Sequence, residues 1–274
     1  MSGTPYQRWN RRWTAALCIA LLAACATSPT GRNQLLLISD GEIGQMGVAA
    51  FDQMKSELPV TKNTGLNRYV SCVSDSILAT LPGQEGRDWE IVVFEDDSAN
   101  AFALPGKKIG VHSGLLKVAV NAAQLATVIG HEIGHVQARH SAERVSLQYA
   151  AQTGQQLAGV LLGEAGPQRD TLMGMLGLGA QYGLVLPYGR VQESEADVLG
   201  LRLMAQAGYD PRESIALWRN MSSASKGQQP PEFLSTHPSH QTRIQDLEKH
   251  MGDAMAAYQR ARASGLRPDC KPPG

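Results

Sequence analysis

Five consecutive residues, His131 to His135, read His-Glu-Ile-Gly-His and constrain the fold more than any other part of the chain. On an α-helix, where each residue turns by about 100°, two histidines four positions apart return to one face and can bind one metal ion. Glu132 lies one position further round, within reach of a metal-bound water. Zinc lowers the pKa of such a water to about 7, and a carboxylate beside it can act as general base. The motif therefore predicts a helix that carries a hydrolytic zinc site.

The residues before the motif support a helix over a chance match. Asn121 is a candidate N-cap with Gln124 three positions on, and apolar residues then recur at helical spacing, at Leu125, Val128 and Ile129. Two histidines on a mostly apolar helix have few polar partners unless a metal binds them, and burying them unpaired is costly. We therefore expect one Zn²⁺ at this helix.

A catalytic zinc usually takes three protein ligands, so one more must come from elsewhere. Residues 191–207 are the best source, because they show a helical pattern that carries three acids. Glu193 and Asp197 are four apart and share a face, whereas Glu195 lies about 200° from Glu193 and points away. Geometry leaves either Glu193 or Asp197 as the third ligand. Whichever of the two is not the ligand would hold a histidine by a hydrogen bond. A solvated acidic face is the alternative without a metal.

Four motifs together resemble metallopeptidase family forty-eight over about residues 40–250. They are the His-Glu-Ile-Gly-His motif, Glu193-Ser194-Glu195-Ala196-Asp197, Asn100-Ala101-Phe102-Ala103-Leu104-Pro105-Gly106 and Thr236-His237-Pro238. The resemblance implies an α+β fold, a mainly helical gluzincin domain with a small sheet beside the zinc helix. It also implies that Glu193 is the third ligand and that Asp197 lies behind the ligands. Within the family, the chain is most similar to the lipid-anchored periplasmic LoiP type, which lacks a repeat domain.

The resemblance also suggests how a substrate binds. It implies that Asn100, Ala101, Phe102 and Ala103 belong to an edge strand over the cleft, to which a protein or peptide substrate adds as a further strand. Many members have a second glycine after Gly106, where this chain has Lys107. The departure concerns the turn, and the strand itself is still expected.

Two residues beyond these motifs are candidates for catalysis. His237 resembles a histidine that lies near the zinc in some members, either as an extra ligand or as a group that stabilises the oxyanion. Arg243 lies six residues further on, where a guanidinium can bind a substrate carbonyl or the oxyanion. Alternatively, His237 is an ordinary loop histidine and Arg243 forms a surface salt bridge.

The amino terminus resembles the signal peptide of a bacterial lipoprotein. Arg8, Arg11 and Arg12 precede a short apolar run that ends in Leu-Ala-Ala-Cys25. This pattern predicts a signal peptide at residues 1–24, lipid on Cys25, a tether at 25–40 and a peptidase domain at 41–270. It also predicts a periplasmic location, with the lipid anchored to the outer membrane.

The remaining cysteines and the charge give two further expectations. In an oxidising compartment, Cys72 and Cys270 are expected to pair, and this disulfide would stabilise the fold by about 4 kcal/mol in the chain-entropy model; two free thiols are the alternative. Without residues 1–24 the chain has 22 basic and 25 acidic side chains, so no nucleic-acid binding is expected.

These patterns predict a zinc endopeptidase of the bacterial envelope that cleaves misfolded or stalled proteins with Glu132 as general base. The alternatives are a lipoprotein chaperone that works with the outer-membrane assembly machinery, and an esterase or amidase acting on cell-wall material. Helices are expected at about 40–57 and 64–81, and strands at 89–95 and 109–112. The glycine-rich residues 154–189 are interpreted as a lid or as a loosely packed helical hairpin.

Overall fold

The predicted metal-binding segment forms helix α4, Ala122–Gln137, in the computed structural model, which describes residues 25–83, 85–161, 189–224, 233, 237 and 243–273. Asn121 caps this helix, because its side-chain oxygen accepts a hydrogen bond from the N–H of Gln124 at 2.9 Å. The Gln124 side chain reaches back and accepts from the N–H of Val120 at 3.0 Å. The helix is buried without a break from Gln124 to His135.

Helix α7, Arg190–Gln206, packs against α4 at very short range. A Cβ atom added at Gly200 would lie 2.6 Å from the backbone nitrogen of His131, and one added at Gly134 would lie 2.9 Å from the carbonyl oxygen of Ala196. Only glycine permits this approach of the two backbones. The close packing brings the acids of α7 within reach of the histidines of α4.

A three-stranded sheet lies on the other side of α4. Strand β3, Glu90–Phe94, is parallel to β5, Lys108–His112, and β5 pairs antiparallel with β4, Ala101–Leu104. The order β3-β5-β4 makes β4 an edge strand, as predicted. In the turn from β4 to β5, Gly106 and Lys107 both have positive φ angles, of 85° and 64°. Lys107 thus takes the left-handed conformation that a second glycine would take more easily.

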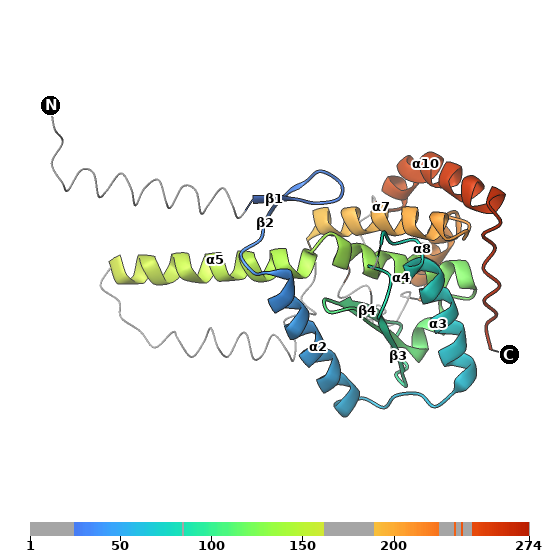
Figure 1. Ribbon diagram of the computed structural model, residues 1–274, viewed down its shortest axis with the longest axis horizontal. Coiled ribbons are helices and arrows are strands. Elements are labelled where there is room, and N and C mark those ends of the chain that lie inside the picture. Colours follow the sequence, from blue (N-terminus) through green and yellow to red (C-terminus); the bar gives the residue numbers. More distant parts are fainter. Residues whose placement is uncertain are drawn as a thin grey trace. The chain divides into compact units, whose positions relative to one another are not determined.

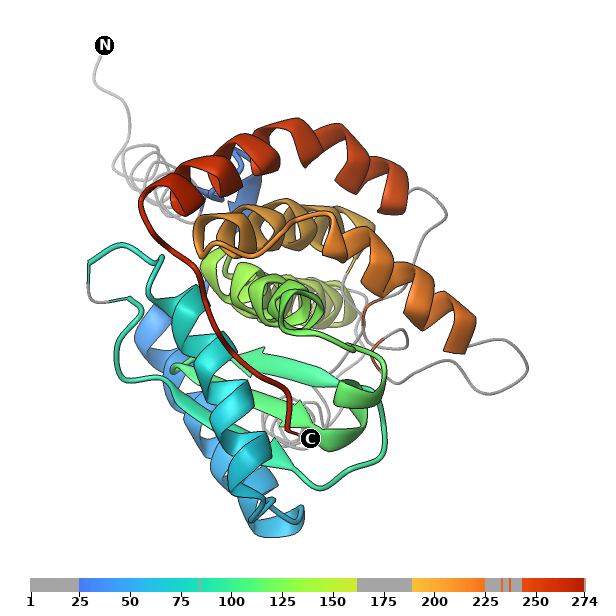
Figure 2. The ribbon, with the colours of Figure 1, turned by 90° about the vertical axis from the view of Figure 1, so that its right-hand side faces the viewer.

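The chain divides into two units, and α4, α7 and the sheet belong to the one formed by residues 41–141 and 167–274. The other helices of this unit surround α4 and the sheet. They are α2 (Asp40–Glu57), α3 (Thr64–Leu78), the 3₁₀ helix η1 (Ser113–Lys117), α8 (Glu213–Ala224) and α10 (Arg243–Ala263). Figure 1 labels these elements except η1, and Figure 2 shows α10, α7 and α4 stacked above the sheet. The fold confirms the predicted α+β class, mainly helical with a small sheet beside the zinc helix.

The second unit consists of residues 1–40 and 142–166. Its described part contains the antiparallel strands β1, Cys25–Thr27, and β2, Asn33–Leu35, with most of helix α5, His140–Leu161. Arg32 donates to Glu143 on α5 at 2.7 Å, and the N–H of Leu37 donates to Ser146 at 2.8 Å. These bonds fix the strands to α5. The predicted signal peptide at 1–24 and residues 162–188 of the glycine-rich segment lie outside the described residues.

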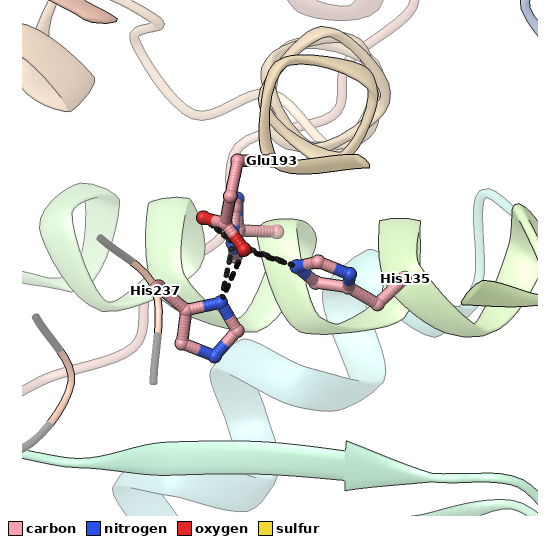
Figure 3. Close-up of side chains that lie close together, drawn as sticks. His135, Glu193 and His237 are labelled. Carbon is pink, nitrogen blue, oxygen red and sulfur yellow. Dashed lines mark hydrogen bonds and ion pairs between the residues drawn. The ribbon is translucent and has the colours of Figure 1, made fainter. Parts of the chain in front are cut away.

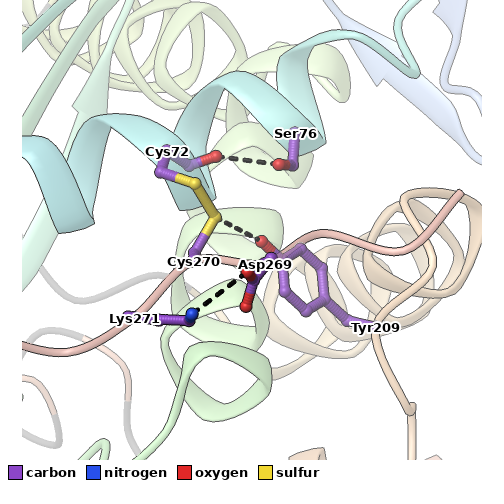
Figure 4. The surroundings of a disulfide bond; sticks show 6 residues. All are labelled: Cys72, Ser76, Tyr209, Asp269, Cys270 and Lys271. Atoms are coloured by element: carbon purple, nitrogen blue, oxygen red, sulfur yellow. Dashed lines mark hydrogen bonds and ion pairs between the residues drawn. A yellow bond between two sulfur atoms is a disulfide. The ribbon is translucent and has the colours of Figure 1, made fainter.

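A disulfide joins Cys72 on α3 to Cys270 in the carboxyl-terminal tail, with the two Cα atoms 5.7 Å apart. The hydroxyl of Tyr209 donates to the sulfur of Cys270 at 3.4 Å (Figure 4). The structure therefore pairs the two cysteines that were expected to pair, and the bond fixes the tail against α3. Among the described residues, no helix is both long enough and apolar enough to span a membrane.

Candidate metal centre

Four side chains from three parts of the chain meet in one buried cluster. His131 and His135 come from α4, Glu193 from α7 and His237 from the segment between α8 and α10, and one donor atom of each lies within 4.8 Å of the others. Figure 3 shows His135, Glu193 and His237 pointing toward one another. The ring of Phe233 stacks on that of His237, with centroids 4.5 Å apart, and helps to position it.

The distances between donor atoms fit a single tetrahedral ion. Nε2 of His131 lies 3.0 Å from Nε2 of His135 and 3.2 Å from Nδ1 of His237. Oε1 of Glu193 lies 3.4 Å from Nε2 of His135 and 3.0 Å from Nδ1 of His237. Four ligands at about 2.0–2.1 Å from a zinc ion are about 3.3 Å from one another in a tetrahedron. Imidazole and carboxylate donors at this spacing therefore suit zinc.

The geometry distinguishes the two acids that the sequence left open. Glu193 faces the cluster, whereas Oδ1 of Asp197 lies 2.9 Å from Nδ1 of His131, on the side of the ring away from the cluster. A carboxylate in that position orients the imidazole and makes it a better metal ligand. Glu193 thus has the position of a ligand, and Asp197 has that of a supporting residue.

Arg243 has a different place from the one expected. Its guanidinium is fully buried, donates to Oε2 of Glu193 at 3.0 Å and to Oδ1 of Asp197 at 2.7 Å, and lies 3.6 Å from the ring centroid of Trp218. These contacts use the guanidinium to hold the two carboxylates in place. We therefore assign Arg243 a structural role behind the ligands, instead of the expected contact with a substrate carbonyl or oxyanion.

Glu132 lies between the cluster and the edge strand. Its Oε2 accepts from the N–H of Ala103 on β4 at 3.2 Å, and its Oε1 is 3.4 Å from Nε2 of His237. Within the described part of the chain, Oε1 is buried and accepts no hydrogen bond. Burial raises the pKa of Glu132, and the neighbouring histidines oppose this shift. A buried carboxylate oxygen without a donor is suited to receive a proton from water.

Burial and the surrounding carboxylates separate the pKa values of the ligands. Burial lowers the pKa of His135, which favours the neutral, metal-binding ring. Burial and the charge of Arg243 lower the pKa of His131, but its hydrogen bonds to Asp197 and Glu193 outweigh them and raise it to about 9. Burial also acts to raise the pKa of Glu193, yet hydrogen bonds from the histidines lower it below its ordinary value.

These shifts predict that zinc displaces a proton. With a pKa of about 9, His131 is protonated at pH 7 in the zinc-free protein and must lose that proton to bind metal. The apparent zinc affinity should therefore rise about tenfold per pH unit from pH 7 to pH 9 and level off above it. Isothermal titration in buffers of different protonation enthalpy should detect about one proton released per zinc at pH 7. Zinc binding with no proton release would contradict this assignment.

In the predicted substrate strand β4, the side chain of Phe102 and the outer backbone edge have different surroundings. The ring of Phe102 packs against Phe51 and Phe94 at centroid distances of 6.3 Å and 6.1 Å, so its side chain belongs to a small aromatic cluster. The N–H of Ala103 points away from β5 toward Glu132. Since Ala101 is two residues away on the same strand, its backbone faces the free edge as well. Asn100 is buried, and its carbonyl accepts from the N–H of His112 at 3.0 Å.

Two residues were not singled out from the sequence. His140 is fully buried, and its Nδ1 lies 2.8 Å from Nδ1 of His135. Glu195, which was expected to point away from the site, lies 3.1 Å from Nε2 of His140. Glu195 is one of three acids within five residues of α7, and that pattern does not single it out as a site residue.

The model of Peptidase family M48 matches residues 63–251 of the chain. The chain belongs to peptidase family M48. This membership confirms the predicted family and, with the buried donor cluster, the prediction of a zinc metallopeptidase. The M48 match contains every residue of the cluster and Glu132.

Three relatives illustrate what the M48 chain is similar to. It is 37% identical to the mitochondrial metalloendopeptidase OMA1 of Schizosaccharomyces pombe, over 77% of this chain and 61% of the relative. It is 38% identical to OMA1 of Arabidopsis thaliana, over 65% and 35%. It is 29% identical to the beta-barrel assembly-enhancing protease of Escherichia coli, over 76% and 44%. The chain therefore spans between about a third and three fifths of the length of these curated relatives.

These relatives contradict the predicted location. The related metalloendopeptidases from fungi, plants and animals are mitochondrial, so the assignment to a bacterial periplasm with a lipid anchor in the outer membrane was wrong. The prediction rested on the arginines, the short apolar run and the Leu-Ala-Ala-Cys25 sequence at the amino terminus. The expected partnership with the outer-membrane assembly machinery depended on that location and is withdrawn with it.

Cys25 is the first residue of strand β1. Its acylation was inferred from the four residues that end at Cys25 and stays a prediction. The boundaries of the predicted segments, at residues 24 and 40, stay predictions as well.

Proposed function

We propose that this chain is a zinc endopeptidase that hydrolyses peptide bonds in misfolded or stalled proteins. His131, His135 and Glu193 would hold the ion, and Glu132 would act as general base. The observation that carries the proposal is the buried convergence of four donor atoms within 4.8 Å, with an unsatisfied oxygen of Glu132 beside them. Because the curated relatives extend beyond the region that matches this chain, the activity of the whole protein is part of this proposal.

Held by His131, His135 and Glu193, a zinc ion would supply Lewis-acid chemistry, which polarises a scissile carbonyl and lowers the pKa of an attacking water. Oε1 of Glu132 takes a proton from that water as it attacks the carbonyl carbon. Glu132 then delivers the proton to the nitrogen of the leaving amine, so the carboxylate is restored at the end of the reaction. Burial raises the pKa of Glu132, which helps it to keep the proton between the two steps.

His237 keeps the site closed in this arrangement. Catalytic zinc sites have three protein ligands and an open position, whereas four protein ligands make a closed site. His237 directs Nδ1 at the donor cluster and Nε2 at Oε1 of Glu132, at 3.4 Å. We propose that His237 moves away when substrate binds, which frees one position and releases Oε1 of Glu132 for water.

The edge of β4 that faces away from β5 provides a route for the substrate. An extended peptide can pair with the backbone of Ala101 and, once Glu132 releases it, with the N–H of Ala103, and this places the peptide beside Glu132. Pairing with the backbone carries little sequence preference and requires an extended chain. Unfolded polypeptides therefore fit this site better than compact domains.

Pancreatic ribonuclease with intact disulfides, compared with the same protein reduced and alkylated, tests this selectivity. We expect the zinc-loaded enzyme to cleave the reduced form and to leave the folded form intact, and a chelator should abolish cleavage. Peptides identified by mass spectrometry provide the measurement. Binding of the reduced form without cleavage would support a chaperone in place of a peptidase, and equal cleavage of both forms would contradict pairing with an extended substrate.

A further inference from the structure

The imidazole of His135 has a second ring nitrogen that faces away from the donor cluster. While Nε2 faces Glu193 at 3.4 Å, Nδ1 lies 2.8 Å from Nδ1 of His140. Nε2 of His140 in turn lies 3.1 Å from Oε2 of Glu195. His140 is fully buried and Glu195 is 5% exposed, so solvent does not compete for these contacts.

The chemistry of this chain of contacts fixes the position of each proton. A neutral imidazole that binds a metal through Nε2 carries its proton on Nδ1. The short distance between the two Nδ1 atoms then requires His140 to accept that proton through a lone pair on its own Nδ1. A neutral His140 that accepts at Nδ1 carries its proton on Nε2, where the carboxylate of Glu195 accepts it. All three groups are satisfied by one arrangement, in which Nε2 of His135 offers its lone pair to the cluster.

The backbone between the two histidines supports a specific placement of His140. Helix α4 ends at Gln137, and Arg139 has a φ angle of 54°, in the left-handed region. This conformation is unfavourable for a residue with a side chain and persists where the surroundings require it. Here it reverses the chain so that His140, at the start of α5, lies against His135.

We propose that His140 and Glu195 are positioning residues, which hold the ring and tautomer of His135 for metal binding. Besides Glu132 on α4, helix α7 then supplies three acids of the site: Glu193 faces the cluster, Asp197 holds His131 directly, and Glu195 holds His135 through His140. The inference rests on the proposed zinc site. It assigns to Glu195 the role for His135 that Asp197 has for His131.

Zinc affinity measured by competition with a chelator tests the proposal without relying on activity. We expect His140→Leu to bind zinc about 10–100-fold more weakly than wild type, because it removes the acceptor for Nδ1 of His135. His140→Asn places an amide oxygen near the position of Nδ1 and should stay within about threefold of wild type. His250→Leu, an exposed histidine on α10, is the matched control and should have no effect. Wild-type affinity in His140→Leu would overturn the proposal.

Imidazole ¹⁵N chemical shifts of the zinc-loaded wild-type protein give a second measurement that needs no variant. We expect His140 to carry its proton on Nε2 and none on Nδ1. A proton on Nδ1 of His140 would overturn the proposal, even if His140→Leu failed to fold. Absence of stoichiometric zinc in the wild type would instead refute the proposed function, whereas a zinc-binding, active wild type with unchanged affinity in His140→Leu would refute only the positioning role.

Discussion

Glu132→Gln is expected to keep zinc and to lose peptide hydrolysis by a factor of about 10²–10⁴, the usual contribution of a general base. Glutamine has the shape of glutamate, and its amide oxygen can still accept from the N–H of Ala103. It cannot take a proton from water, because an amide oxygen is a very weak base. The rate of cleavage of reduced, alkylated ribonuclease, together with the zinc content of the same sample, measures both parts of this prediction.

Glu248→Gln on the exposed face of α10 is the matched control for this variant, since it makes the same chemical change far along the chain from the motif. The control should cleave at the wild-type rate. Full activity in Glu132→Gln with zinc bound would remove Glu132 from the mechanism. Loss of activity together with zinc would show that Glu132 acts in metal binding.

Glu193→Gln is expected to weaken zinc binding at least about 100-fold, because the free energy of binding, about 10–16 kcal/mol in structural sites, is shared among about four ligands. The carboxylate of Glu193 lies within 3.5 Å of ring nitrogens of all three histidines of the cluster and accepts from Arg243. Glu193 is the only charged ligand in the cluster, and its negative charge balances part of the charge of the metal. A neutral amide removes that charge. It also leaves the charge of Arg243 with Asp197 as its remaining carboxylate partner among these contacts.

Chelator competition measures the zinc affinity of Glu193→Gln, and circular dichroism of the zinc-free protein shows whether the fold is retained. A folded variant with wild-type affinity would exclude Glu193 as a ligand. Such a result would direct attention to Asp197, the other acid on the same face of α7.

Local sequence patterns predicted the parts of the site that depend on one or two helices. The cap at Asn121 and the burial of α4 were predicted from the residues themselves, and helical spacing placed Glu193 and Asp197 on one face. The edge position of β4 followed from the resemblance to the family. For the helices α4 and α7, local sequence patterns alone were enough to place the side chains.

Two contacts that depend on tertiary packing were not predicted. Glu195 points away from Glu193 on a helical wheel, yet it reaches the site through His140, which the left-handed residue Arg139 brings back against α4. Arg243 was expected to face substrate, and only the packed structure shows that it lies over Trp218 behind the carboxylates. Spacing along the chain contains no information about either contact.

Reconstitution with zinc tests the central claim most directly. Protein stripped of metal by a chelator should not cleave reduced, alkylated ribonuclease, and stepwise addition of zinc should restore cleavage in proportion until one zinc is bound per chain. Glu132→Gln, titrated in parallel, should bind the same single zinc and stay inactive. Cleavage that persists in metal-free protein, or zinc that binds stoichiometrically without restoring cleavage in the wild type, would contradict the assignment of this buried cluster as the active site of a zinc peptidase.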